Sequence, residues 1–111
     1  MTLQVSNQKK PIGIAIAGLG FGESVHIPAL EANNDLQLIS LWHPRLKRLN
    51  EASKKNHINI HEKWNDLLND PNVEGIIIAT PPEARFKLAY EALEAGKHLL
   101  LEKPVALNST E

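Results

Sequence analysis

The chain has 111 residues, of which 42% are hydrophobic and 23% are charged, and its formal net charge is −1. This length suits one domain with a sizeable core, and the composition is typical of a soluble globular protein, which argues against a disordered chain. The nearly balanced charge argues against nucleic-acid binding, and the lack of cysteine excludes disulfides and thiolate metal sites.

The N-terminal segment does not show the pattern expected of a secretory signal peptide. Residues 1–10 are polar, lack the apolar core of a signal peptide, and are expected to be a disordered lead-in. No apolar run approaches the length that crosses a membrane. We therefore expect a cytoplasmic protein without a membrane partner, and the lack of cysteine fits a reducing compartment.

The first predicted element is an apolar run at residues 12–17 that ends in the alternating glycines Gly18, Gly20 and Gly22. A short, isoleucine-rich segment closed by glycine is typical of a buried strand followed by a turn. Strand, glycine turn and helix start form the first βα unit of a dinucleotide-binding fold, where glycine lets the backbone approach a pyrophosphate. The usual G-x-G-x-x-G spacing is broken, because Glu23 stands at the third glycine position. On the motif alone, an ordinary glycine-rich turn stays an alternative.

The rest of the chain alternates between predicted helices and strands. Hydrophobic periodicity and turn residues predict strands at 36–42, 58–60, 75–79 and 98–101, and helices at 23–32, 45–56, 64–68 and 81–95. Thr80 is expected to cap the last of these helices and Gly96 to stop it.

The predicted core combines strand and helix residues. The expected core of the sheet is Ile14, Ile16, Leu38, Leu41, Ile76, Ile78 and Leu100. The expected inner faces of the helices carry Val25, Ala29, Leu30, Leu46, Leu49, Ala52, Leu88, Ala89, Ala92 and Leu93.

Regular alternation of strand and helix predicts a doubly wound α/β domain with a five-stranded parallel sheet in the order 3-2-1-4-5. In this order the crossovers diverge between the first and fourth strands, so a crevice opens at their carboxyl ends. Three segments reach that edge, at residues 18–22, 80–82 and 102–104. We expect them to form one site.

The chain resembles the glucose-fructose oxidoreductase, inositol dehydrogenase and rhizopine-catabolism (Gfo/Idh/MocA) family from about Lys10 to the last residue. The residues that carry the resemblance are Gly18-Leu19-Gly20, His26, Ala79-Thr80-Pro81-Pro82, Ala95-Gly96-Lys97-His98 and Glu102-Lys103-Pro104. Members of this family are NAD(P)-dependent oxidoreductases that act mostly on sugars, cyclitols and related alcohols. They have a Rossmann domain followed by a larger α/β domain, and the 111 residues resemble only the first, so we expect a single domain at 11–111.

The resemblance implies a set of site residues. The pyrophosphate would bind to the turn of Gly18, Leu19, Gly20, Phe21 and Gly22. Thr80, Pro81 and Pro82 would line the ribose and nicotinamide. Glu102 would face the nicotinamide, and Lys103 would be the active-site lysine. Chemistry supports this role, since an ammonium at the carboxyl edge can polarise the reacting oxygen and exchange a proton with it. The alternative for Lys103 is a surface lysine.

The end of the second strand predicts a preference for NADP over NAD. An NAD site usually places Asp or Glu there, whereas this chain has His43, followed by Arg45, Lys47 and Arg48. Arginine matches a phosphate with its planar fork. We include His43 and Arg45 among the cofactor-binding residues. A merely solvated basic helix face is the alternative.

Two residues depart from the family pattern. Arg85 stands where the family often has histidine, and Glu23 stands where it usually has glycine. A carboxylate at position 23 would lie close to the pyrophosphate and weaken its binding.

Several functions stay open at this point. The leading hypothesis is the cofactor half of an oxidoreductase, which by itself binds dinucleotide weakly and turns over no substrate. Alternatives are a module that senses dinucleotide or pairs with a chain supplying the substrate half, a homo-oligomer, an S-adenosylmethionine methyltransferase, and a functionless remnant. The histidines show no metal-ligand spacing, so no metal site is expected. A nucleotide-hydrolysing phosphate loop is excluded because no G-K-[ST] sequence is present.

Overall fold

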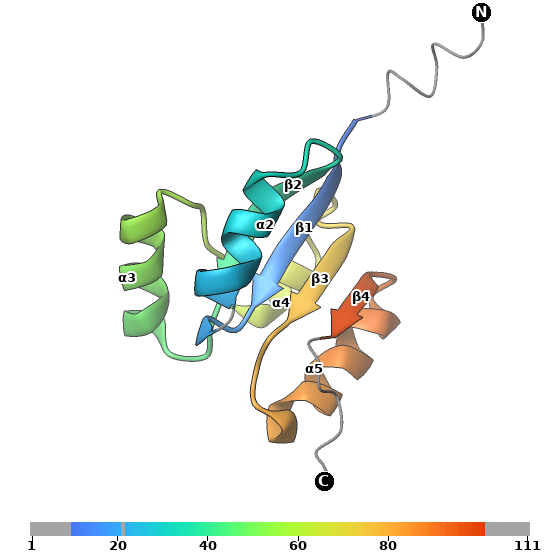
Figure 1. The fold of residues 1–111 in the computed structure, drawn as a ribbon. Coiled ribbons are helices and arrows are strands. Elements are labelled where there is room, and N and C mark those ends of the chain that lie inside the picture. The colour runs from blue at the N-terminus through green and yellow to red at the C-terminus, as the bar shows by residue number, and fades with distance from the viewer. Residues whose placement is uncertain (1–9, 21, 102–111) are drawn as a thin grey trace, which may run out of the picture.

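The computed structural model describes residues 10–20 and 22–101 (Figure 1). Four parallel strands form one sheet in the order β2-β1-β3-β4. The strands are β1 (Ile12–Ala17), β2 (Leu36–Trp42), β3 (Gly75–Ile78) and β4 (His98–Leu101). The helices are the π-helical turn η1 (Gly22–His26), α2 (Ile27–Glu31), α3 (Leu46–Asn56), α4 (Trp64–Leu68) and α5 (Pro82–Glu94). The predicted α/β class and parallel sheet are confirmed.

The prediction of a third strand at residues 58–60 is wrong, because no regular strand forms there. This segment lies beside β2, where the order 3-2-1-4-5 places it, but it contributes only an isolated bridge between Leu41 and Ile60. The predicted order is therefore matched only roughly. His57, just before the segment, has the left-handed φ of 58°. His61, just after the segment, makes polar contacts through its side chain.

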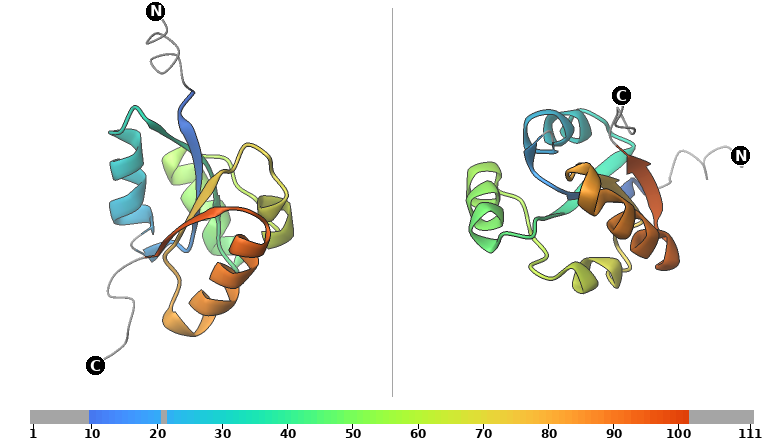
Figure 2. Two further views of the ribbon diagram at one scale, coloured as in Figure 1. Left: turned by 90° about the vertical axis from the view of Figure 1, so that its right-hand side faces the viewer. Right: turned by 90° about the horizontal axis from the view of Figure 1, so that it is seen from below.

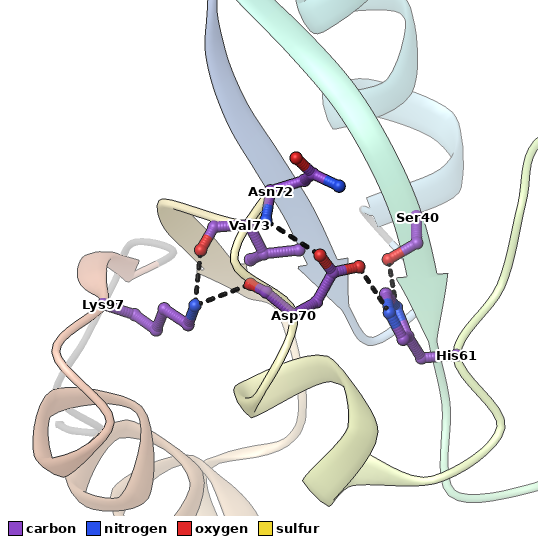
Figure 3. Close-up of polar contacts among 6 residues, drawn as sticks. All are labelled: Ser40, His61, Asp70, Asn72, Val73 and Lys97. Carbon is purple, nitrogen blue, oxygen red and sulfur yellow. Dashed lines mark hydrogen bonds and ion pairs between the residues drawn. The ribbon is translucent and has the colours of Figure 1, made fainter.

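These polar contacts tie the sheet edge to the loop before β3 (Figure 3). Ser40 Oγ lies 2.5 Å from His61 Nδ1, and His61 Nε2 lies 3.0 Å from Asp70 Oδ2. Lys97 Nζ donates to the carbonyl oxygens of Asp70 and Val73 at 2.9 and 2.6 Å. The segment at 58–60 makes almost no backbone ladder with β2, and side-chain hydrogen bonds connect this edge of the sheet to the neighbouring loop instead.

Helices cover both faces of the sheet (Figure 2). On one face, α2 and α3 pack against β1 and β2 through residues such as Leu30, Leu49 and Ile16. On the other face, α4 and α5 contribute Leu67 and Leu88 to a second cluster with β3. This two-sided burial explains why the central strands are almost wholly apolar.

Five residues expected on buried faces are exposed. Leu100 is 52% exposed because β4 is the edge strand and its neighbour Leu99, on the opposite face, packs against the α5 side. Val25, Ala29, Leu46 and Leu93 are also exposed, since the inner faces of their helices are formed by other residues. Leu38 is only partly buried. The remaining predicted sheet residues are buried: Ile14, Ile16, Leu41, Ile76 and Ile78.

Two helix starts also differ from the prediction. The helix expected at 23–32 is divided into η1 and α2, with Pro28 in the first turn of α2, where its missing N–H costs nothing. Thr80 does not cap α5, because Pro81 occupies the N-cap position without a side-chain bond. The predicted stop holds, since α5 ends at Glu94 and Gly96 follows with φ 81°.

Within residues 10–20 and 22–101, no helix combines the length and apolarity needed to cross a bilayer. The same residues contain no group of three or more metal-ligating side chains.

Candidate functional site

The glycine turn lies directly against the end of β3. Gly18 has φ 106°, and a β-carbon on it would meet the carbonyl carbon and oxygen of Ala79 at 2.7 Å and the amide nitrogen of Thr80 at 2.9 Å. Its own N–H donates to the carbonyl of Trp42, at the end of β2, at 2.9 Å. Glycine is therefore required here for both its conformation and its lack of a side chain. The turn joins the carboxyl ends of three strands.

Gly20 differs from Gly18 because its surroundings are open. It is exposed, and a β-carbon on it would meet nothing within 4 Å. Leu19 between them is buried and anchors the turn in the core. The space over Gly20 fits the close approach of a pyrophosphate to the backbone. Phe21 lies outside the described residues, and Gly22 begins η1.

Thr80 brings a buried hydroxyl to the same edge. The residue is 5% exposed, and within the described part of the chain its Oγ1 has no hydrogen-bond partner. An unpaired buried hydroxyl is costly, so such a group indicates a polar ligand or water. Pro81 and Pro82, which follow, are exposed. These three residues fit a dinucleotide that passes over the end of β3.

Arg85 is a positioning residue that the sequence did not identify as such. It is 7% exposed, on the buried face of α5, and its Nη2 donates to the carbonyl oxygen of Thr80 at 3.2 Å. The guanidinium therefore holds the turn that carries Thr80. The available signal was the spacing of Arg85 with Leu88, Ala89 and Ala92, which places it on the inner face of the helix.

His43 and Arg45 lie at the end of β2, as expected. The backbone N–H of Arg45 donates to His43 Nδ1 at 3.0 Å, and Arg45 is the N-cap residue of α3. Burial lowers the pKa of His43 below its ordinary value of 6.5, and the charges of Arg48 and Arg45 add to this effect. The imidazole is therefore neutral at pH 7. No carboxylate occupies the position that normally selects NAD.

The carboxylate of Glu23 does not stand free beside the glycine turn. It lies 2.6 Å from Arg48 Nη2 and accepts a second hydrogen bond from Asn56 Nδ2 at 2.9 Å. The bond from Arg48 is the main reason that the pKa of Glu23 is lowered. Sequence reasoning treated these two residues separately, and the structure brings them together.

An aromatic hollow of about 480 Å³ lies beside the end of β2, between α4 and α5. Trp42 and Trp64 have ring centroids 5.0 Å apart, and Trp64 Nε1 donates to Glu91 at 2.8 Å. These are the two tryptophans of the sequence. Their indoles can therefore report on ligands at this edge.

Glu102 and Lys103 lie outside the described residues. The last described residue, Leu101, ends β4 beside Ile78 of β3. Leu101 thus lies at the same end of the sheet as the glycine turn and Thr80.

Comparison with known proteins identifies the family. The family model described as an oxidoreductase family with an NAD-binding Rossmann fold (Gfo/Idh/MocA) matches residues 12–111. The chain belongs to this family.

Two curated relatives match this family member over most of its length. An uncharacterized oxidoreductase, sll0816, of Synechocystis is 39% identical over 99 residues, covering 88% of this chain and 27% of the relative. Galactose 1-dehydrogenase of Pseudomonas fluorescens is 34% identical over 97 residues, which cover 86% of this chain and 30% of the relative. The chain thus spans under a third of the length of these relatives.

A solved structure shows the same fold. Biliverdin reductase of Synechocystis, determined with biliverdin and NADP⁺, superposes with a TM-score of 0.77 at 29% identity, covering 87% of this chain and 31% of that one. The similarity confirms the Rossmann architecture of the described residues.

Proposed function

We propose that this chain forms the dinucleotide-binding part of an oxidoreductase that moves a hydride between a nicotinamide cofactor and an alcohol carbon of a sugar or cyclitol. The observation that carries the proposal is the packing of the Gly18 turn against Thr80, with an open approach at Gly20 and a Thr80 hydroxyl that has no partner among the described residues. Galactose 1-dehydrogenase among the relatives supports a sugar-type substrate.

In this proposal the described residues bind the dinucleotide and orient it. When bound, the nicotinamide accepts or donates the hydride. The turn from Gly18 to Gly20 holds the pyrophosphate, and the Thr80 hydroxyl gains the partner that it lacks within the described residues. Arg85 keeps this segment in place. In alcohol oxidation the carbon loses a hydride and its hydroxyl loses a proton, and we assign the exchange of that proton to Lys103.

The proposal includes a preference for NADP(H). The position that would hold a carboxylate for the ribose hydroxyls of NAD is taken by neutral His43, with Arg45 next to it. The related biliverdin reductase was determined with NADP⁺. The alternative is a solvated basic helix face with no selectivity.

We further propose that residues 1–111 bind dinucleotide weakly and do not turn over substrate. Hydride transfer needs the alcohol carbon held against the nicotinamide with water excluded. The chain matches 27–30% of its curated relatives, and the wall that would exclude water is assigned to the portion that it does not match. A cytoplasmic location remains a prediction.

The test is titration of the purified chain with NADP⁺ and with NAD⁺, in which binding is measured by calorimetry and by tryptophan fluorescence. Binding of at least one dinucleotide is expected, and reduction of NADP⁺ with a panel of polyols is not. Steady reduction that disappears in Lys103→Met would contradict the proposed lack of turnover. Binding of S-adenosylmethionine without dinucleotide binding would favour a methyltransferase.

The competing hypothesis is a module that senses dinucleotide or works with a partner chain. Co-purification of a second polypeptide, together with activity only in its presence, would favour that hypothesis. Size-exclusion chromatography of the purified chain separates a homo-oligomer from a monomer.

A further inference from the structure

An ion pair connects the glycine turn to the helix after β2. Glu23 lies in η1, and Arg48 lies in the first turn of α3, 25 residues later. The distance from Arg48 Nη2 to Glu23 Oε1 is 2.6 Å. Asn56, at the other end of α3, binds Glu23 Oε2 and the carbonyl oxygen of Ala52, both at 2.9 Å. Both oxygens of the carboxylate are therefore engaged, and its position is well defined.

The position of Glu23 makes this pair informative. The third glycine of a dinucleotide fingerprint normally serves close packing of helix against strand. Here the residue is glutamate within a π-helical turn, and only 14% of its side chain is exposed. Its carboxylate bonds to α3. The side chain at this position thus has a specific partner, and that partner is a cation in the first turn of the helix that follows β2.

Arg48 also lies near the end of β2, because β2 ends at Trp42 and α3, which carries Arg48 in its first turn, begins at Leu46. Its charge contributes to the lowered pKa of His43, so the guanidinium lies within electrostatic range of the position that normally reads the 2′ substituent of the adenosine ribose. A guanidinium has five N–H donors, and the bond to Glu23 uses the Nη2 group. With 37% of the side chain exposed, donors are left for a ligand.

We propose that Arg48 binds the 2′-phosphate of NADP(H) and that Glu23 is a positioning residue that holds the guanidinium for this contact, an inference that rests on the proposed dinucleotide binding. A mobile arginine loses side-chain entropy when it binds a phosphate, and an arginine already held by a carboxylate loses less. Arg45 is the alternative cation, but it is exposed and its recorded bond to His43 comes from the backbone.

The local charge balance is compatible with a phosphate. The cations that influence Glu23 and His43 are Arg45, Arg48 and Lys55. Glu23 offsets one of these charges, and neutral His43 adds none. An excess of positive charge is left at the end of β2, so the carboxylate does not cancel the attraction for a phosphate dianion.

The test compares NADP⁺ with NAD⁺, and adenosine 2′,5′-bisphosphate with adenosine 5′-phosphate, by calorimetry on the full chain. We expect Arg48→Gln to weaken NADP⁺ binding by about 10- to 100-fold, the loss of a hydrogen bond between charged groups. Glu23→Gln should weaken it by about 3- to 10-fold, because the guanidinium is released and must be ordered on binding. Affinity for NAD⁺ should change by less than about twofold in both variants, as no 2′-phosphate contact is lost.

The matched control is Lys54→Gln, which removes an exposed charge from the same helix and should leave both affinities unchanged. In the double variant, the effect of Glu23→Gln on NADP⁺ should vanish, since Glu23 acts through Arg48.

Other outcomes separate the inference from the proposed function. If Glu23→Gln tightens NADP⁺ binding, the carboxylate competes with the phosphate and the positioning role is wrong. If either variant weakens both dinucleotides equally, that residue is structural only, and an unchanged ratio in Arg48→Gln places the phosphate contact elsewhere. If the unaltered chain binds neither dinucleotide but folds, the proposed function itself fails, and the inference with it.

Discussion

Ser40 Oγ and His61 Nδ1 are joined by a hydrogen bond of 2.5 Å between β2 and the residue that follows the segment expected to be the third strand. His61 Nε2 faces the carboxylate of Asp70 at 3.0 Å. Because an ionised carboxylate only accepts, Nε2 carries the proton, and in the neutral ring Nδ1 accepts from the Ser40 hydroxyl. Ser40 is 1% exposed, and the side chains of His61 and Asp70 are 16% and 22% exposed. The buried Ser40 hydroxyl therefore has its partner within the fold, and we expect these hydrogen bonds to stabilise the domain.

Replacing His61 with alanine should destabilise the domain by about 1–3 kcal/mol, because the buried Ser40 hydroxyl loses its partner and the Asp70 carboxylate loses one of its two hydrogen bonds. Urea unfolding measures this change. The control is His98→Ala, at an exposed position on β4, which should stay within about 0.5 kcal/mol of the unaltered chain. Equal stability of the His61 and His98 variants would show that the hydrogen bonds contribute nothing.

Gly18→Ala and Gly20→Ala form a matched pair. Gly18→Ala should lower the free energy of unfolding by at least about 2 kcal/mol, since its methyl group would meet backbone atoms at 2.7 Å and φ at this position is 106°. The second should change the free energy of unfolding by less than about 0.5 kcal/mol, because its surroundings are open. It should nevertheless weaken dinucleotide binding, as the methyl group keeps the pyrophosphate from the backbone. If Gly20→Ala binds dinucleotide as tightly as the unaltered chain, the glycine turn does not contact the pyrophosphate.

Thr80→Val separates stability from binding. The substitution keeps the shape of the side chain and removes a buried hydroxyl that has no partner within the described residues. Stability should stay the same or rise by up to about 1 kcal/mol. Dinucleotide affinity should fall if the hydroxyl serves the ligand. A loss of stability, measured by thermal unfolding, would instead show that the hydroxyl is already bonded in the free protein.

The ion pair of Glu23 and Arg48 should make the free energy of unfolding depend on pH in the acidic range. The folded protein lowers the pKa of Glu23 below its ordinary value of 4.5, mainly through the hydrogen bond from Arg48. A lowered carboxyl pKa contributes stability that is present above 4.5 and is lost as the pH falls through the folded pKa. The difference in unfolding free energy between the unaltered chain and Glu23→Gln should therefore shrink below pH 4.5. A constant difference from pH 7 to pH 3 would contradict this assignment.

The sequence alone determined the alternation of strands and helices and the place of the glycine turn. Residues 12–17 and 75–78 are so apolar that only strands covered on both faces accommodate them. Gly18 marks a backbone conformation that other residues adopt at a cost. Such signals are local, because they depend on the composition and spacing of neighbouring residues.

Tertiary structure decided which of the apolar residues are covered. Leu100 and Leu46 have the right character for a core, yet both are exposed, since burial depends on a neighbouring element rather than on the residue itself. The same reason reduces the third strand to one bridge, because the segment from Ile58 to Ile60 lies at the edge of the sheet.

The partner of Glu23 could not be predicted from the spacing. The sequence predicts that its carboxylate lies close to the pyrophosphate but indicates no partner for it, and η1 and α3 bring it to Arg48 and Asn56. Ser40 and His61, 21 residues apart, meet in the same way. A local pattern specifies the element to which a polar side chain belongs. Its partner depends on the packing of distant segments, and a buried polar group must find that partner because leaving it unpaired costs free energy.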